Sequence, residues 1–95
     1  MYNLATGPVA REMTLRLESA LHPTRMELED QSDRHIGHAG HDGRGESHFF
    51  LLIESPAFAG LNRVARQRRI YAALGDLMDE RVHALSIRAL APGEH

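Results

Sequence analysis

The chain has no cysteine among its 95 residues. This absence excludes a disulfide framework, so the burial of apolar side chains has to stabilise the fold. It also excludes a thiol nucleophile. Any iron–sulfur or other soft-metal chemistry would therefore require sulfur ligands from another molecule.

The sequence also lacks an excess of positive charge and long apolar runs. Its formal net charge of -2 at pH 7 gives no overall basic field that would attract nucleic acids or membranes. Apolar runs are short, as at residues 49–53, whereas roughly 20 apolar residues are needed to span a bilayer. The first eight residues lack the basic and apolar regions of a signal peptide. We therefore expect a soluble protein of the cytoplasm.

Histidine, in contrast, is abundant, and four of the seven histidines fall within residues 34–49: His35, His38, His41 and His48. Four glycines separate them and predict a loop. Imidazole is the commonest protein metal ligand, which makes this segment a candidate metal site. A His-x₂-His-x₂-His run could bind Zn²⁺ or Cu²⁺ alone, but the spacing is not a recognised zinc pattern. Ordering a glycine-rich loop would also oppose binding.

The apolar pattern predicts two main helices. The first begins at Pro8 and ends before Pro23, and the second extends over residues 61–78. Ser55 is expected to cap a single helical turn over residues 55–58. One face of the second helix is expected to hold Val64, Tyr71, Leu74 and Met78, with Ile70 and Leu77 beside it.

Three segments are predicted to be strands, at residues 26–31, 49–53 and 82–89. The first two could pair as a hairpin with a long loop. The order is thus α-β-β-α-α-β, which indicates a small α+β domain whose three-stranded sheet has helices packed on one face. We expect a single domain over residues 1–95, with a core at about 9–90 and a frayed tail at 92–95.

Several separated motifs resemble those of the BolA-like family in both order and spacing. The similarity extends from about residue 12 to residue 89. The motifs are Ser32-x-Arg34-His35, Glu46-Ser-His-Phe49, Phe58-x-Gly60, Arg66-x-Arg68, Tyr71-x-x-Leu74 and Val82-His-Ala-Leu85. One departure is Gln67, which occupies the middle of the family's R-H-R motif.

The resemblance implies a fold like the class II KH domain and a monothiol glutaredoxin with a Cys-Gly-Phe-Ser motif as partner. Such pairs share a [2Fe–2S] cluster, in which the glutaredoxin and its bound glutathione supply the sulfur and the BolA-like chain supplies histidine. The implied function is iron–sulfur cluster handling or iron regulation, with no cofactor intrinsic to the isolated chain. We expect that chain to be a monomer or a weak dimer.

Three histidines are the predicted metal ligands under this resemblance. His83 is preferred because a sheet would fix its position on the last strand. His35 is the preferred loop ligand, since it occupies the S-x-R-H position, and His38 is the next choice. The sequence favours a solvated His41 and a structural hydrogen bond for His48.

Arg63, Arg66 and Arg68 are candidates for contact with a partner or nucleic acid, because clustered arginines bind phosphates and carboxylates. The resemblance also implies an alternative function, a transcription regulator of cell shape and stress response, which would bind DNA through this arginine-rich helix. The spacing of the arginines forms no clean basic stripe. RNA binding of the KH type is disfavoured because the segment between the short and long helices, residues 60–63, has no G-x-x-G sequence. Enzymatic activity is not expected, since no convincing Ser–His–Asp arrangement is present.

Overall fold

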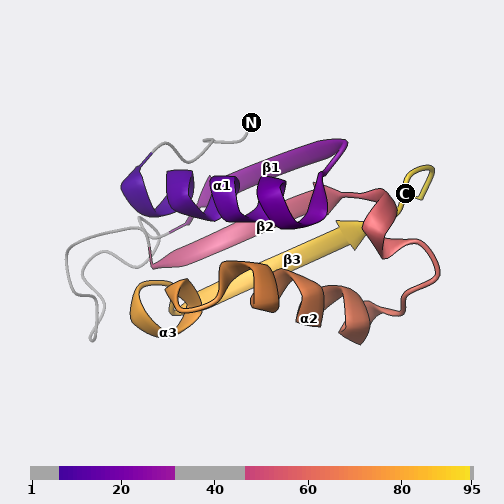
Figure 1. Cartoon of the computed structure of the whole chain (residues 1–95). Helices are drawn as coiled ribbons and strands as arrows, with labels where there is room; N and C mark the ends of the chain where they lie inside the picture. The colour runs from indigo at the N-terminus through magenta and orange to yellow at the C-terminus, as the bar shows by residue number, and fades with distance from the viewer. Residues whose placement is uncertain (1–6, 32–46, 95) are drawn as a thin grey trace.

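The computed structural model describes residues 7–31 and 47–94. These residues form a small α+β domain, as predicted (Figure 1). Its elements are α1 (Pro8–Leu21), β1 (Arg25–Asp30), β2 (His48–Glu54), the 3₁₀ turn η2 (Pro56–Phe58), α2 (Arg63–Leu74), α3 (Leu77–Glu80) and β3 (Ala84–Leu90). The loop predicted for the histidine-rich segment falls on residues 32–46, which lie outside the described residues. Within the described ranges, no helix has the length and apolar character needed to cross a membrane.

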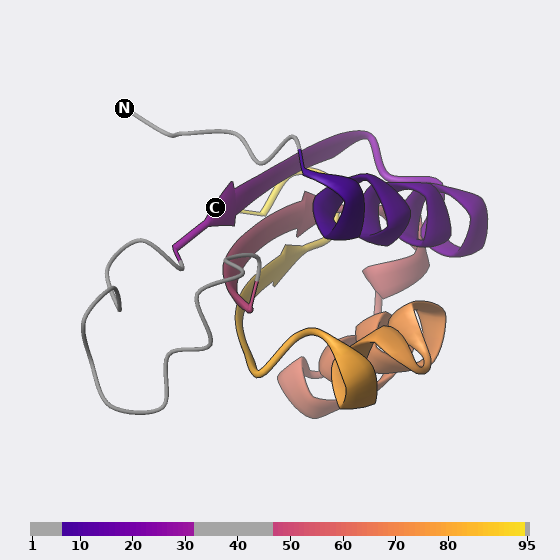
Figure 2. The ribbon, with the colours of Figure 1, turned by 90° about the vertical axis from the view of Figure 1, so that its left-hand side faces the viewer.

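The sheet has the strand order β1-β2-β3. β1 and β2 pair in antiparallel fashion, with Leu28 opposite Leu51, which confirms the predicted pairing of the first two strands. β2 and β3 run parallel, joined by the crossover through α2 and α3. Figure 2 shows all the helices on one face of the sheet, as the sequence predicts.

The core lies between this sheet face and the helices. Alternate residues of β2, Phe49, Leu51 and Ile53, are buried there with apolar side chains of both long helices, such as Met13 and Ile70. Successive side chains on a strand point to opposite faces of its sheet. Residues 48, 50, 52 and 54 of β2 therefore belong to the face without helices.

Helix ends follow local sequence signals. Pro8 occupies the first turn of α1, and the Asn62 side chain caps α2 by accepting from the Ala65 N–H at 2.8 Å. Ser55 caps η2 as predicted, because its Oγ accepts from the Ala57 N–H at 3.1 Å. The same buried hydroxyl donates to the Leu21 carbonyl at 2.5 Å, so it also ties the end of α1 to the end of β2.

The helix predicted over residues 61–78 is in fact two helices, which corrects the sequence interpretation. α2 ends at Leu74, where Gly75 adopts φ 57° and ψ -129°, a backbone conformation that favours glycine. Ile70 is fully buried, whereas Val64 and Tyr71 are 55% and 41% exposed. The buried face of α2 is therefore rotated relative to the predicted one.

Candidate functional site

The backbone around His83 is fixed by the first residues of β2. His83 lies immediately before β3, and not within the strand as predicted. Its N–H donates to the Ser47 carbonyl at 2.7 Å, and the next N–H, of Ala84, donates to the same oxygen at 3.1 Å. Val82 is buried in the core on the other side of His83. The position of the His83 Cα is thus set from both sides.

The His83 side chain is exposed and lies against His48. The two ring centroids are 6.3 Å apart, with an interplanar angle of 72°. His48 is half-buried, and its Nδ1 lies 2.9 Å from the Ser47 Oγ, which agrees with the structural hydrogen bond predicted for this histidine. The His83 ring makes no hydrogen bond with the described residues, so both of its nitrogens are open to a ligand.

The described residues on either side of residues 32–46 lie at the same end of the sheet. Ser47 contacts His83 as above, and the Gln31 N–H donates to the His48 carbonyl at 2.7 Å. His35, His38 and His41, between them in the chain, lie outside the described residues. The ligand roles of His35 and His38 therefore stay predictions, as does that of His83.

The described donors at this end of the sheet are the imidazoles of His48 and His83. No group of three or more His, Cys, Asp or Glu side chains gathers in residues 7–31 and 47–94 to hold a metal. Neutral imidazoles are nevertheless the ligands that replace thiolates on one iron of a [2Fe–2S] cluster of the Rieske type. One exposed imidazole on a fixed backbone would suit a site completed by further ligands.

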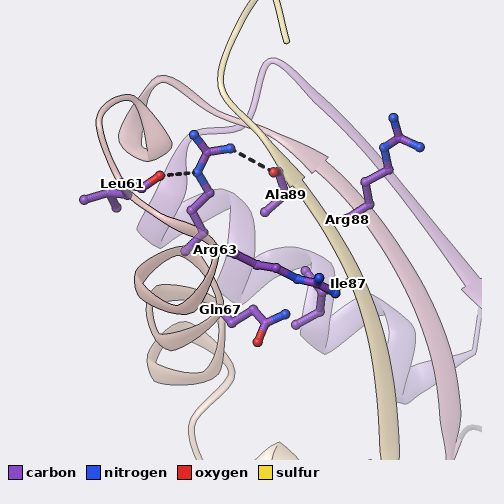
Figure 3. Close-up of a pocket in the computed structure, with 7 residues that line it drawn as sticks. Leu61, Arg63, Gln67, Ile87, Arg88 and Ala89 are labelled. Atoms are coloured by element: carbon purple, nitrogen blue, oxygen red, sulfur yellow. Dashed lines mark hydrogen bonds between the residues drawn. The ribbon is translucent and has the colours of Figure 1, made fainter. Parts of the chain in front are cut away.

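A second constellation surrounds Arg66, at the other end of β3. The guanidinium donates to the Leu61 carbonyl at 2.9 Å and to the Ala89 carbonyl at 3.0 Å (dashed lines in Figure 3). It also forms a two-pronged ion pair with Glu94, at 2.5 and 2.9 Å. These bonds join the start of α2, the end of β3 and the C-terminal tail.

The bonds from Arg66 and from the Ala91 N–H lower the pKa of Glu94 to about 2. Glu94 is thereby tied to the domain, and the frayed tail expected over residues 92–95 stays a prediction. Arg66 has an intramolecular structural role, whereas Arg63 and Arg68 are exposed and have no ion pair among the described residues. Partner contact stays a prediction for all three arginines.

Two of these contacts, between His48 and His83 and between Arg66 and Glu94, were not predicted from the sequence. The contact between His48 and His83 depends on the pairing of β2 with β3, which places His48 opposite Ala84. The pairing of Arg66 with Glu94 links residues 28 positions apart. Neither pair has a local sequence signal, although a parallel alignment of the two predicted strands would have brought the histidines together.

The comparisons with known proteins agree on one family. A family model described as "BolA-like protein" matches residues 17–94. An uncharacterized protein in the cobS 5′ region of Sinorhizobium sp. is 48% identical over 80 residues, which cover 83% of this chain and 86% of the relative. The chloroplastic protein BOLA1 of Arabidopsis thaliana is 41% identical over 87 residues, which cover 90% of this chain but only 54% of that protein.

The solved structures agree with the sequence matches. The BolA domain of SufE1 from Arabidopsis thaliana superimposes with a TM-score of 0.84 at 44% identity, covering 96% of this chain and 100% of that one. This likeness supports the mixed three-stranded sheet with helices on one face described above.

Proposed function

The chain belongs to the BolA-like protein family, and from this premise we propose that it is the histidine-supplying partner of a monothiol glutaredoxin. In this proposal the two proteins share a [2Fe–2S] cluster used in iron–sulfur cluster handling or iron regulation. The glutaredoxin cysteine and glutathione supply the sulfur ligands that a cysteine-free chain lacks. The function is one of binding and not of catalysis, and we place it in the cytoplasm.

The observation that supports this proposal most directly is the placement of His83. Its ring is exposed and makes no hydrogen bond among the described residues, while its N–H bonds to the Ser47 carbonyl at 2.7 Å. A ligand held on a rigid element reaches a metal with little loss of conformational entropy. His83 is therefore the proposed ligand that is in place before the partner arrives.

The second ligand is proposed to come from His35, with His38 as the next candidate. His35 is four positions beyond Gln31 in the sequence, and Gln31 is hydrogen-bonded to His48 beside His83. The contact between His48 and His83 suggests a supporting role for His48, which restricts the orientation of the His83 ring.

The alternative function, DNA binding through Arg63, Arg66 and Arg68, has weaker support. The Arg66 guanidinium is engaged with two carbonyls and Glu94, so phosphate contact would compete with bonds that stabilise the domain. Phosphate contact would make DNA affinity fall steeply with salt. A salt slope near zero, or no loss of affinity on neutralising Arg63 and Arg68, would exclude this function.

Reconstitution tests the cluster proposal. The chain is mixed with a Cys-Gly-Phe-Ser glutaredoxin, glutathione, iron and sulfide, and visible absorption and circular dichroism are recorded. We expect a mixed-cluster spectrum that differs from that of the glutaredoxin alone. His83→Ala should abolish that difference, and His35→Ala should reduce it.

His22→Asn is the matched control, because His22 is an exposed histidine at the end of α1 with φ 46°, a conformation that asparagine tolerates. This variant should give the wild-type spectrum. If His83→Ala retains the mixed-cluster spectrum while the two proteins still associate, the assignment of His83 as ligand is wrong. If the proteins do not associate at all, the partner proposal itself fails.

A further inference from the structure

The outer edge of β3 presents unpaired peptide groups. β3 is the last strand of the described sheet, so only β2 pairs with it. The Ala84 N–H bonds to Ser47 and the Leu90 carbonyl bonds to Ser55, which places the even-numbered peptide groups of β3 on the β2 side. Because peptide groups alternate along a strand paired on one side, those of Leu85, Ile87 and Ala89 face outward.

Only the far end of this edge is covered. The Ala89 carbonyl accepts from Arg66 at 3.0 Å, whereas the outward peptide groups of Leu85 and Ile87 make no hydrogen bond among the described residues. Natural proteins usually protect an open edge with charges, proline or a covering segment. Among the described residues, no segment pairs with this edge at Leu85 and Ile87, and a hollow lies beside it.

A hollow of about 420 Å³ lies between this edge and the start of α2. It is lined by Leu61, Arg63, Arg66, Gln67, Ile87, Arg88 and Ala89. In Figure 3 the Arg63 side chain reaches from α2 toward Ile87, and Arg88 points away on the other side of β3. An added strand would thus meet an arginine on each of its two faces.

The groove is positively charged, which favours an acidic ligand. Arg63 and Arg88 are exposed and have no ion pair among the described residues, and no acidic side chain lines the hollow. Its other arginine, Arg66, is neutralised by Glu94. The groove also has an apolar wall, formed by Leu61 and Ile87.

We propose that the outer edge of β3 is a docking site for an extended, acidic segment of a partner protein, which adds to the sheet as a fourth strand. Its backbone pairs with the outward peptide groups of Leu85 and Ile87. Its side chains meet Arg63 and the apolar wall on one face and Arg88 on the other. A peptide is favoured over single-stranded nucleic acid because no aromatic side chain lines the groove to stack on bases. This site is separate from His83 and does not depend on the proposed cluster.

The probe is the synthetic peptide acetyl-(Val-Glu)₃-Val-amide, titrated into the full chain and followed by NMR. We expect shifts centred on the amides of Leu85, Ile87 and Ala89, and none with the matched (Val-Lys)₃ peptide. N-methylation of all the valine amides, or of all the glutamate amides, gives two further peptides. In an added strand, only the valine amides or only the glutamate amides face β3. Only the peptide methylated on those amides should therefore bind more weakly, by about five- to tenfold for each hydrogen bond removed.

Arg63→Glu should weaken binding of the acidic peptide and strengthen binding of the basic peptide. Arg69→Glu is the control, since this exposed arginine of the same helix lies beside Ala20 and Leu21 of α1. His83→Ala should leave peptide binding unchanged, which separates this proposal from the cluster proposal.

Equal effects of the two N-methylated sets, or no shifts at residues 85–89, would overturn strand addition. Tighter binding of a single-stranded oligonucleotide at the same amides would assign the groove to nucleic acid instead. Concentration-dependent shifts at these amides without peptide would assign the edge to a second copy of the chain.

Discussion

The two ends of β3 both carry side chains with metal-binding or anion-binding chemistry, but they differ in how far that chemistry is already used. At the start, the exposed His83 ring makes no hydrogen bond with the described residues, although its backbone is held by Ser47. At the other end, Arg66 bonds to two carbonyls and a carboxylate. Residue type alone makes both His83 and Arg66 candidates for a functional site. Their hydrogen bonds distinguish them, because Arg66 already binds groups of its own domain, whereas the His83 ring binds none among the described residues.

The comparison depends on the core beneath the His83 end. Phe49 is 1% exposed, follows His48 and pairs in register with Leu85. Phe49→Ala should lower the free energy of unfolding by about 3–5 kcal/mol, because it removes a buried aromatic ring and leaves a cavity. Urea denaturation measures this loss. A loss below about 1 kcal/mol would mean that the core does not hold this end of the sheet.

The turn at Gly75 links the two ends, since α2 begins near Arg66 and α3 leads back to His83. Gly75→Ala should lower the unfolding free energy by about 1–3 kcal/mol, because alanine is strained at φ 57°. The added Cβ would lie 3.5 Å from the nearest side-chain atom, in Arg16, so steric overlap is not the cause. Gly60→Ala, at φ 78° in open space, should show a similar strain.

The Arg66 end should respond to acid. The folded-state pKa of Glu94 is lowered to about 2, so its ion pair contributes stability above the ordinary carboxyl pKa and loses it as pH falls toward 2. Glu94→Gln should therefore be less stable than the wild type at pH 6, with a difference that shrinks between about pH 5 and pH 2. Denaturation curves at several pH values measure the difference. In an Arg66→Ala background the same substitution should have little effect, and a full effect there would show that the ion pair is not the cause.

The smallest change in stability is expected at His83. His83→Ala removes an exposed ring without a hydrogen bond among the described residues, so the unfolding free energy should change by no more than about 0.5 kcal/mol. The same variant should lose the mixed-cluster spectrum. A loss of several kcal/mol would instead show that His83 is a structural residue, and the contrast between the two ends of β3 would not hold.

Much of the fold was predictable because its signals are local. Pro8, Ser55 and the continuous apolar run of β2 act through their own backbone and nearest neighbours, and the helix start, the cap and the strand were all found where predicted. The predicted helix over 61–78 failed at Gly75, since an isolated glycine in a helical pattern does not reveal its backbone conformation. The buried face of α2 was misjudged for a related reason, because a face depends on what the helix packs against.

The sequence by itself determined the class of the domain, its membership of a family through separated motifs, and the absence of any thiol ligand. Tertiary structure alone decided which histidine, arginine and glutamate side chains contact one another. Parallel pairing of β2 with β3 brings His48 against His83, and the return of the tail brings Glu94 to Arg66 across 28 positions. Such contacts depend on strand register and chain path, which many distant residues set together through the core, and no short segment of sequence encodes them.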